Sequence, residues 1–323
     1  MIWLVALVSC AVGAGVTAAL IPYLRKVGML GKDVHKPGRP EVAEMGGLAL
    51  VVGFGAGVLL AIALEAFSPH LLPLDFTRLL AVLATVLLTA LVGIADDLLG
   101  IPQSVKALLP VVAALPLVAI RAGETAMVLP WIGKVEFGLF YPLFLVPAAV
   151  TGAANAVNML AGFNGLELGM GVVAMGALAV VAAHLGQTTA LVMLLAGIGA
   201  CLGVLLFNWY PARIFVGDVG TLAIGAILAS ACIVGNFELA GVVLIIPYAL
   251  DFLIKAGHRF PSSGWWGELG PDGKLRCPSH GPVGLAQAVL KLTRGLSERS
   301  LVLVLIGFEA LFGLIAILLY LPL

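Results

Sequence analysis

The sequence predicts an all-α integral membrane protein, folded as a single domain (1–323) with a bundle of about ten transmembrane helices. Hydrophobic residues make up 62% of the 323 residues, charged residues make up 11%, and the mean hydropathy is +1.15. A soluble domain is nearer ~45–50% apolar and ~25% charged. The apolar residues form long continuous runs, which are typical of membrane helices and not of the short alternating strands of a β-barrel.

A helix needs about 20 residues to cross the hydrocarbon core of a membrane. The first apolar run continues to residue 24 without a clear cleavage site, so we interpret it as a span and not as a signal peptide. The fourth, sixth and eighth spans of the series are short. The ten predicted spans are 2–24, 46–66, 77–95, 105–120, 139–157, 168–184, 189–208, 221–235, 239–255 and 300–321.

Three of the connections between these spans are distinctive. Residues 25–45 are basic and contain prolines, and residues 256–299 form the longest loop. Residues 121–138 contain two apolar runs that flank Gly133 and Lys134. Apolar runs on both sides of a glycine turn predict a small β-hairpin there.

The basic residues predict the orientation of the bundle. With ten spans, the loops fall into two alternating sets. Of the 17 Lys and Arg residues, all except Arg78, Arg121 and Lys134 lie in the set that contains 25–45 and 256–299. Because loops rich in Lys and Arg stay in the cytoplasm, this set is predicted to be cytoplasmic. Both termini are then predicted to lie on the opposite side.

Composition also excludes several classes of function. The formal net charge is zero, so no nucleic-acid partner is expected. The four cysteines are scattered and predict small packed residues, not a disulfide framework. Cys277 and His280 form only a lone C-x-x-H, which is a weak indication of zinc. The sequence contains no P-loop and no dinucleotide fingerprint.

Polar residues are concentrated in residues 155–169, which read NAVNMLAGFNGLELG between two apolar segments. The stretch contains Asn155, Asn158, Asn164 and Glu167. Amides are costly where they face lipid. The stretch therefore either lines a polar cavity or forms a hydrogen-bonded contact between small-residue helices.

Carboxylates occur at the same predicted face and favour the cavity. Asp96 and Asp97 close the third span in the run IADDLLG, and Asp218 lies in FVGDVG at the start of the eighth. Glycines beside them allow a ligand to approach the backbone closely. Carboxylate and amide oxygens suit Mg²⁺, which commonly bridges to substrate phosphates, and Lys106 and Arg259 suit phosphate charge. The residues thus predict magnesium-dependent chemistry on a phosphate substrate at the cytoplasmic interface.

Four sequence blocks carry a specific resemblance, and they occur in order across nearly the whole chain. They are HKPGRPEVAEMGG, IADDLLG with a following lysine, NAVNMLAGFNGLELG and NWYPARIFVGDVG. Together they resemble the polyprenyl-phosphate N-acetylhexosamine-1-phosphate transferase superfamily, glycosyltransferase family 4. Bacterial branches tend to carry aspartates where this chain has Ala161 and Asn164. This form of the third block, with NWYP before FVGD, resembles the eukaryotic and archaeal branch.

The resemblance implies a reaction. A membrane polyprenyl phosphate of the dolichyl type attacks the β-phosphorus of UDP-N-acetylglucosamine (UDP-GlcNAc), which gives polyprenyl-diphosphate-GlcNAc and UMP. This is the first step of lipid-linked oligosaccharide assembly for N-glycosylation. The implied cofactor is Mg²⁺, with Mn²⁺ as a substitute. The implied partners are the two substrates, the bilayer and a second copy in a homodimer. An archaeal plasma membrane is favoured over the endoplasmic reticulum.

The resemblance also implies roles for individual residues. Asn158 and Asp218 match the metal positions. Asp96 and Asp97 match paired aspartates, of which one orients the lipid phosphate or accepts a proton from it and the other supports the metal or a lysine. Further matches are Lys106 for phosphate, Asn164 and Phe215 for the uridine pocket, Glu44 for an acidic donor-site residue, and His258 and Arg259 for the segment that grips the amino sugar and the diphosphate.

The sequence departs from its relatives in the last loop. Gly257 stands where the eukaryotic branch has an arginine, and Lys255 is a candidate to replace that cation. Most of residues 256–299 does not match the family, although this loop is expected to shape the sugar pocket, so the identity of the N-acetylhexosamine stays open. Lys36 is interpreted as positive-inside charge, with contact to a diphosphate as the alternative.

Three alternatives remain open from the sequence. The chain can be a bacterial-type enzyme that loads undecaprenyl phosphate with another N-acetylhexosamine phosphate. It can be a secondary transporter, since ten spans with polar helix ends also fit that class. It can be a membrane scaffold that has lost activity. The clustering of carboxylates on one face, and the presence of every acidic and amide motif position together, favour the transferase.

Overall fold

The structure is a computed structural model, and it describes residues 2–68, 71–129, 133–261, 264 and 266–321. Among these residues, eight helical segments are long and apolar enough to cross a membrane, so the chain is an integral membrane protein. They are α1 (Trp3–Val27), α2 (Gly47–Phe67), α3 (Phe76–Leu99), η1 (Tyr141–Leu145) continued by α6 (Val146–Met159), α7 (Leu166–His184), α8 (Thr188–Asn208), α9 (Gly217–Gly235) and α13 (Glu298–Tyr320).

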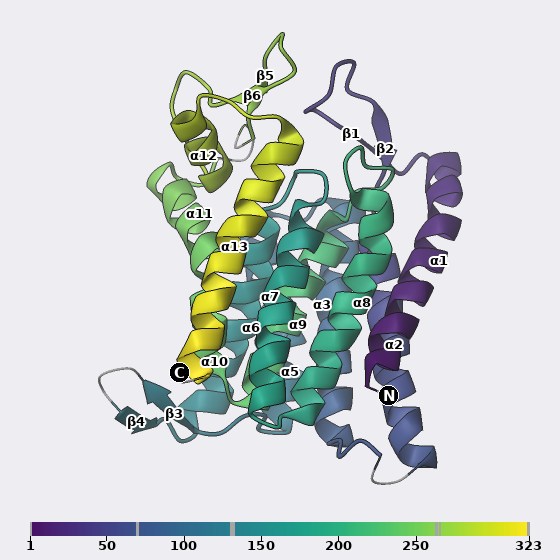
Figure 1. Ribbon diagram of the computed structural model, residues 1–323, viewed down its shortest axis with the longest axis vertical. Coiled ribbons are helices and arrows are strands. Elements are labelled where there is room, and N and C mark those ends of the chain that lie inside the picture. Colours follow the sequence, from purple (N-terminus) through teal and green to yellow (C-terminus); the bar gives the residue numbers. More distant parts are fainter. Residues whose placement is uncertain (1, 69–70, 130–132, 262–263, 265, 322–323) are drawn as a thin grey trace.

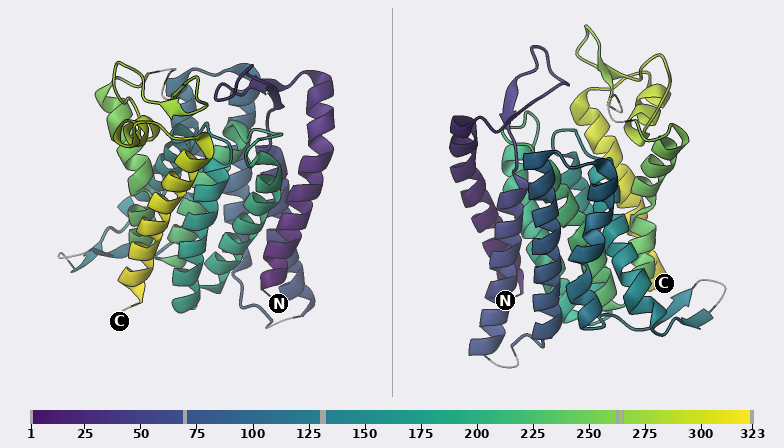
Figure 2. Two further views of the ribbon diagram at one scale, coloured as in Figure 1. Left: turned by 45° about the horizontal axis from the view of Figure 1, so that its top comes forward. Right: turned by 180° about the vertical axis from the view of Figure 1, so that it is seen from behind.

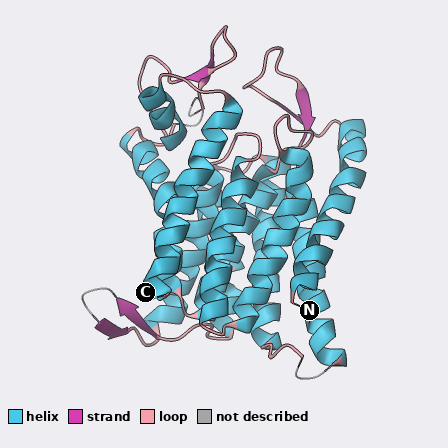
Figure 3. Ribbon diagram, viewed as in Figure 1, coloured by secondary structure: helices cyan, strands magenta, loops and turns pink. Residues whose placement is uncertain are grey.

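The remaining two predicted spans are broken helices. The ninth is a bent pair, α10 (Glu238–Leu244) and α11 (Ile246–Gly257), with an angle of 52° between them. The fourth is a pair of shorter apolar helices, α4 (Gln103–Ala113) and α5 (Leu115–Ala119). In each pair a proline, Pro247 or Pro116, stands at the start of the second helix. Proline has no N–H to continue the preceding helix, which explains both breaks. The all-α prediction is confirmed, and Figure 3 shows helix throughout the bundle.

Short strands lie only outside the bundle in the described part of the chain. Strands β3 (Ala126–Leu129) and β4 (Gly133–Glu136) pair antiparallel, which confirms the hairpin predicted in 121–138. Strands β1 (Leu30–Lys32) and β2 (Glu41–Ala43) pair within the first basic loop. Strands β5 (Glu268–Leu269) and β6 (Leu275–Arg276) pair within the long loop.

The long loop also contains a helix that was not predicted, α12 (Leu285–Thr293). Its Gln287 side chain is completely buried. The amide nitrogen of Gln287 donates to the carbonyl oxygens of Gly264 (2.6 Å) and Trp266 (2.5 Å), and the N–H of Val283 donates to its oxygen (2.8 Å). These hydrogen bonds tie α12 to other parts of the same loop, and the Leu285 N–H at the start of α12 donates to Asp251 of α11 (2.8 Å), which joins the loop to the bundle.

The bundle has two distinct ends. Both termini and the β3–β4 hairpin lie at one end, which we call the terminal end (Figure 1). Strands β1, β2, β5 and β6 and helix α12 lie at the other, which we call the site end, and both views in Figure 2 show the same arrangement. Termini that share one end agree with an even number of crossings.

Helix α9 lies inside the bundle and is buried along almost its whole length. Small residues let its neighbours approach closely. A Cβ on Gly93 of α3 would lie 2.5 Å from the Val219 Cα, and a Cβ on Gly47 of α2 would lie 2.1 Å from the Gly220 nitrogen. These contacts hold the first turn of α9 between α2 and α3, so the position of Asp218 is fixed by backbone packing.

Candidate active site

The last turn of α3 and the first turn of α9 meet through Asp97. The first N–H groups of a helix have no partner within the helix. The Asp97 carboxylate accepts hydrogen bonds from the backbone nitrogens of Asp218 (3.0 Å) and Val219 (3.3 Å). Gly217 has a φ of 70°, and a Cβ there would lie 2.7 Å from an Asp97 oxygen. Glycine at 217 therefore lets Asp97 cap α9 and hold Asp218 in place.

Lys106 joins the other two carboxylates. Its ammonium lies 2.8 Å from Asp96 Oδ2 and also forms an ion pair and hydrogen bond with Asp218 Oδ2. Lys106 is buried in the first turn of α4, although it is a charged residue. Carboxylates this close repel each other unless a cation lies between them. The three predicted catalytic residues, Asp96, Asp97 and Lys106, are thus brought together around Asp218.

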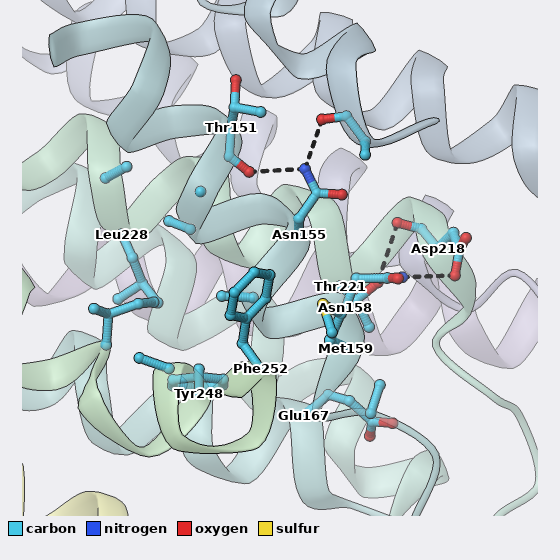
Figure 4. A pocket seen from close by; sticks show the side chains of 18 of the residues that line it. Thr151, Asn155, Asn158, Met159, Glu167, Asp218, Thr221, Leu228, Tyr248 and Phe252 are labelled. Atoms are coloured by element: carbon cyan, nitrogen blue, oxygen red, sulfur yellow. Dashed lines mark hydrogen bonds between the residues drawn. The ribbon is translucent and has the colours of Figure 1, made fainter. Parts of the chain in front are cut away.

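Asn158 completes this polar group from α6. Its amide nitrogen donates to Asp218 Oδ1 (2.7 Å) and to Thr221 Oγ1 (2.8 Å), as Figure 4 shows. Both hydrogen bonds use the nitrogen, so the amide oxygen of Asn158 is the atom that can coordinate a cation. The donors here are carboxylate and amide oxygens without sulfur, which suits Mg²⁺ or Mn²⁺. The two predicted metal ligands therefore lie side by side with chemistry that fits the ion.

Glu44 and Phe215 meet where the first loop runs beside the segment before α9. The Phe215 N–H donates to the Ala43 carbonyl (2.7 Å), and the Gly46 N–H donates to the Phe215 carbonyl (2.8 Å). Both Glu44 and Phe215 line the cavity described below. Burial, and then the negative charge of Asp97, raise the pKa of the Glu44 carboxyl above its usual range.

Asn164 lies in a buried group of polar residues that we call the charge cluster (Asp33, Lys36, Asn164 and Glu298). The Lys36 ammonium contacts Asp33, Asn164 Oδ1 (3.0 Å) and Glu298 Oε2 (2.9 Å). Asn164 Oδ1 also accepts from the Ala212 N–H (2.6 Å), and its nitrogen donates to Asp33 (3.2 Å). The cluster ties the first loop, the turn between α6 and α7, and the start of α13 together.

The charge cluster was not predicted from the sequence. The sequence favours positive-inside charge for Lys36, whereas the structure places its ammonium between two carboxylates. Asp33 and Glu298 gave no signal, because isolated acidic residues beside membrane spans are common at helix ends. Asp33, His35 and Glu298 each also offer an atom that could coordinate a metal ion, and these three atoms lie within 4.8 Å of one another. We assign no metal to them, because the Lys36 ammonium already neutralises part of their charge.

The residues predicted to grip the sugar and the diphosphate lie apart from this group. His258 and Arg259 are exposed after the end of α11, and the His258 Nδ1 lies 2.9 Å from the Ile254 carbonyl oxygen. Their neighbours Phe260 and Pro261 line the cavity, whereas His258 and Arg259 are not part of its wall in the described chain. Their roles stay predictions.

Lys255 is buried and lines the cavity near the end of α6. Its ammonium lies 2.7 Å from Asp251 Oδ2 and donates to the Met159 carbonyl. The side chain therefore neutralises a buried carboxylate and satisfies a carbonyl at a helix end. Whether it also replaces the arginine missing at Gly257 stays open.

One large cavity joins these residues to an apolar interior. Its volume is about 1460 Å³, and its wall includes Asp96, Asp97, Lys106, Asn158 and Asp218. Figure 4 shows Asp218 and Asn158 on one side, and Leu228, Tyr248 and Phe252 on the other. The wall continues to Tyr141 and Glu238, which lie toward the terminal end. A charged mouth that opens into an apolar interior can hold a phosphate head and a hydrocarbon tail at once.

Comparison with known proteins agrees with the motifs. The family described as glycosyl transferase family 4 matches residues 79–236. A Saccharolobus solfataricus protein, provisionally named as a UDP-N-acetylglucosamine–dolichyl-phosphate N-acetylglucosaminephosphotransferase, is 36% identical over 94% of this chain and 92% of its own length. The Dictyostelium discoideum protein of the same name is 29% identical over 93% of this chain and 84% of its own length.

A bacterial relative is also similar. The phospho-N-acetylmuramoyl-pentapeptide-transferase of Streptococcus pneumoniae is 30% identical over 72% of this chain and 73% of its own length. The resemblance inferred from four motif blocks is confirmed by matches that extend over most of the chain. The chain belongs to glycosyl transferase family 4.

Proposed function

We propose that this protein transfers N-acetylglucosamine-1-phosphate from UDP-GlcNAc to a dolichyl-type polyprenyl phosphate, as the first step of lipid-linked oligosaccharide assembly. The products are polyprenyl-diphosphate-GlcNAc and UMP. The observation that carries the proposal is the cavity that joins the Asp96–Lys106–Asp218 group to an apolar interior. The archaeal and eukaryotic relatives, which are named for this reaction, support the choice of substrates.

The two substrates differ in solubility, and the cavity suits both. The nucleotide sugar comes from water and fits the site end, where loops and charged residues surround the cavity. The polyprenyl chain fits the apolar part between α6, α9 and α11, whose wall includes Leu228, Tyr248 and Phe252. The lipid phosphate would then lie near Lys106, whose ammonium suits phosphate charge.

Each side chain of the polar group has a role in this proposal. Asp218 and the amide oxygen of Asn158 would hold Mg²⁺ or Mn²⁺. When bound, the ion supplies charge neutralisation for the diphosphate and for the leaving phosphate of UMP. Lys106 binds phosphate, and Asp96 orients the Lys106 ammonium from 2.8 Å. Asp97 positions Asp218 by capping α9. Such a transfer depends on positioning and charge neutralisation more than on covalent chemistry by the protein.

The donor would lie along the first loop. Glu44 and Phe215 line the cavity there, and we assign them to the uridine half of the donor. Asn164 supports that pocket, because Lys36, Asp33 and the Ala212 N–H hold its side chain in place. His258 and Arg259 would reach the diphosphate and the amino sugar only if the end of α11 moves toward the cavity, since neither residue is part of the cavity wall in the described chain.

We propose that the site end faces the cytoplasm. The loops at that end carry nearly all of the Lys and Arg residues, and such loops remain cytoplasmic. An archaeal plasma membrane suits the identity to the Saccharolobus protein. A homodimer remains part of the proposal from the family resemblance alone.

A bacterial-type reaction on undecaprenyl phosphate is the second candidate. The Streptococcus relative supports it, at 30% identity. Asn164 argues against it, because the bacterial branches tend to carry aspartate at that position. The family assignment favours either transferase over a secondary transporter.

Purified protein assayed with each donor and each lipid tests the proposal. UDP-GlcNAc and UDP-N-acetylgalactosamine would be compared in the presence of dolichyl or undecaprenyl phosphate, with Mg²⁺. We expect UMP release with UDP-GlcNAc and dolichyl phosphate. Faster release with undecaprenyl phosphate would favour the bacterial-type reaction, and no release with any pair would contradict both candidates.

A further inference from the structure

His35 forms part of the cavity wall beside the charge cluster. Its ring stacks on Phe163, with centroids 4.6 Å apart and an interplanar angle of 9°. The edge of Trp266 lies against it, with centroids 6.4 Å apart and an angle of 77°. Only 6% of His35 is exposed, and His35, Phe163 and Trp266 all line the cavity. Two aromatic neighbours therefore fix the orientation of the imidazole.

The two ring nitrogens of His35 are in different situations. Nδ1 lies 3.7 Å from Glu298 Oε1 and thus has a carboxylate beside it. Nε2 is buried, and no atom of the described residues forms a hydrogen bond with it. A buried polar atom without a partner costs roughly 1–3 kcal/mol, and such atoms in native proteins usually pair with a ligand or an ordered water. Nε2 is therefore the atom for which a partner has to be found.

We propose that His35 Nε2 is a hydrogen-bonding contact for the donor nucleotide sugar. This inference rests on the proposed function. The charge cluster beside the ring contains two carboxylates, Asp33 and Glu298, against one ammonium, Lys36. That local excess of negative charge disfavours a phosphate group. An ionised carboxylate can only accept, so the proton of the neutral ring lies on Nδ1, facing Glu298, and Nε2 is an acceptor. The partner of Nε2 is therefore an uncharged donor, either a hydroxyl or N–H group of the uridine or one of the N-acetylated sugar.

The donor is a better partner than the lipid for a structural reason. His35 lies in the first loop at the site end, and its neighbours Phe163 and Trp266 come from two other loops at that end. The apolar wall formed by Leu228, Tyr248 and Phe252 belongs to helices of the bundle. A contact at His35 is thus separate from the part of the cavity that suits a hydrocarbon chain.

Two matched variants separate the two nitrogens. His35→Asn keeps a polar group near the Nδ1 position, facing Glu298, and loses the one near Nε2. His35→Gln reaches the Nε2 position and loses the one near Nδ1. Both lose the ring, so the stacking on Phe163 is removed equally. We expect His35→Asn to raise the KM for UDP-GlcNAc about tenfold, as for one lost hydrogen bond. We expect His35→Gln to stay within about twofold of the wild type and kcat to change little in both.

Inhibition by UMP and by UDP identifies the half of the donor that His35 contacts. If the contact is to the uridine, His35→Asn weakens inhibition by UMP and UDP by the same factor as it raises the KM. If the contact is to the sugar, inhibition by UMP and UDP is unchanged while the KM for UDP-GlcNAc rises. His184→Gln, at an exposed position at the end of α7, is the control and should leave all three constants unchanged.

Three outcomes would overturn the inference. Equal constants for His35→Asn, His35→Gln and the wild type would mean that Nε2 meets only an ordered water. A larger effect of His35→Gln than of His35→Asn would assign the role to Nδ1 and Glu298, as a positioning residue. Lower melting temperatures for both variants with unchanged KM would make His35 purely structural. Absence of UMP release by the wild type would instead contradict the proposed function itself.

Discussion

Asp96 and Asp97 are neighbours in the sequence but make different contacts. Asp96 pairs with the Lys106 ammonium, whereas Asp97 accepts two backbone hydrogen bonds from the start of α9. The sequence predicts the pair and its position at a helix end. It does not predict the division of roles, because that division depends on a helix that begins more than a hundred residues later. The same limit applies to the charge cluster, whose members come from three separate segments.

Asp218 is the carboxylate that joins the buried lysine to the amide of α6. It contacts Lys106 and Asn158 at once. Asp218→Asn keeps the shape of the side chain and removes the charge. We expect turnover to fall on the order of a hundredfold or more, since charge stabilisation is usually the largest contribution to such a reaction. Binding of Mn²⁺, measured by electron paramagnetic resonance, should weaken as well.

Asp272→Asn is the matched control for this prediction, because Asp272 is exposed in the turn between β5 and β6. It should leave both measurements unchanged. Near-normal turnover in Asp218→Asn, with the control intact, would contradict the assignment of the metal to Asp218.

Glu44 allows a prediction about pH. Burial, and then the charge of Asp97, raise the pKa of its carboxyl in the folded protein. The folded state therefore holds the proton of Glu44 more tightly than the unfolded state, and stability is lost as pH rises through the ordinary Glu pKa of about 4.3 toward the raised value. Glu44→Gln removes this loss. We expect it to melt at a higher temperature than the wild type at pH 8, and the difference to shrink in acid.

The donor should bind less tightly to Glu44→Gln. We therefore expect the KM of this variant for UDP-GlcNAc to rise, although the variant is more stable than the wild type at pH 8. Glu41→Gln, at an exposed position in β2, should change neither quantity. A Glu44→Gln protein that melts at or below the wild-type temperature at pH 8 would contradict the assigned cause of the shift.

At the scale of elements, the close packing of α2, α3 and α9 positions the site. The sequence shows glycines near each carboxylate, which predicts close approach, but it does not show which backbone they approach. In the structure, Gly93 lies against the turn that contains Asp218 and Val219. Periodicity in an almost uniformly apolar chain cannot predict such a partner, because every face of each helix is apolar.

Gly93→Ala tests this packing. The added methyl group would lie 2.5 Å from the Val219 Cα and 2.6 Å from the Asp218 carbonyl carbon. Backbone cannot yield as a flexible side chain does, so we expect a loss of roughly 1–3 kcal/mol of stability and at least a tenfold fall in activity as Asp218 moves. The measurements are the melting temperature and the rate of UMP release.

Gly176→Ala is the control, because a Cβ at Gly176 of α7 would meet nothing within 4 Å. It should match the wild type in both measurements or melt slightly higher, since alanine favours helix over glycine. If both variants behave alike, the packing of α3 on α9 does not position the site.

At the scale of the whole molecule, the sequence predicts more of the fold than of the site. In the described chain, eight of the ten predicted spans are long enough to cross a membrane as single helical segments, and the other two are the pairs α4–α5 and α10–α11, broken at prolines. The cavity was not predictable, because an apolar furrow cannot be distinguished among apolar helices. Its course from Lys106 toward Glu238 is a property of the assembled bundle.

The orientation of the whole bundle in the membrane can be tested by cysteine labelling. In a background without native cysteines, we would introduce Lys134→Cys in β4 and Lys274→Cys between β5 and β6, both at exposed positions at opposite ends of the bundle. In intact cells, a thiol reagent that cannot cross the membrane should label Lys134→Cys only. Labelling of Lys274→Cys instead would place the site end outside and contradict the cytoplasmic assignment.

In the proposed reaction, the β-phosphate of the donor stays with the sugar. The most direct measurement is the identity of the nucleotide released by the purified protein with UDP-GlcNAc, dolichyl phosphate and Mg²⁺, together with the mass of the lipid product. We expect UMP and a lipid diphosphate, and loss of both when the lipid is omitted or the metal is chelated. Release of UDP with a lipid monophosphate would show transfer of the sugar alone and would contradict the proposed reaction.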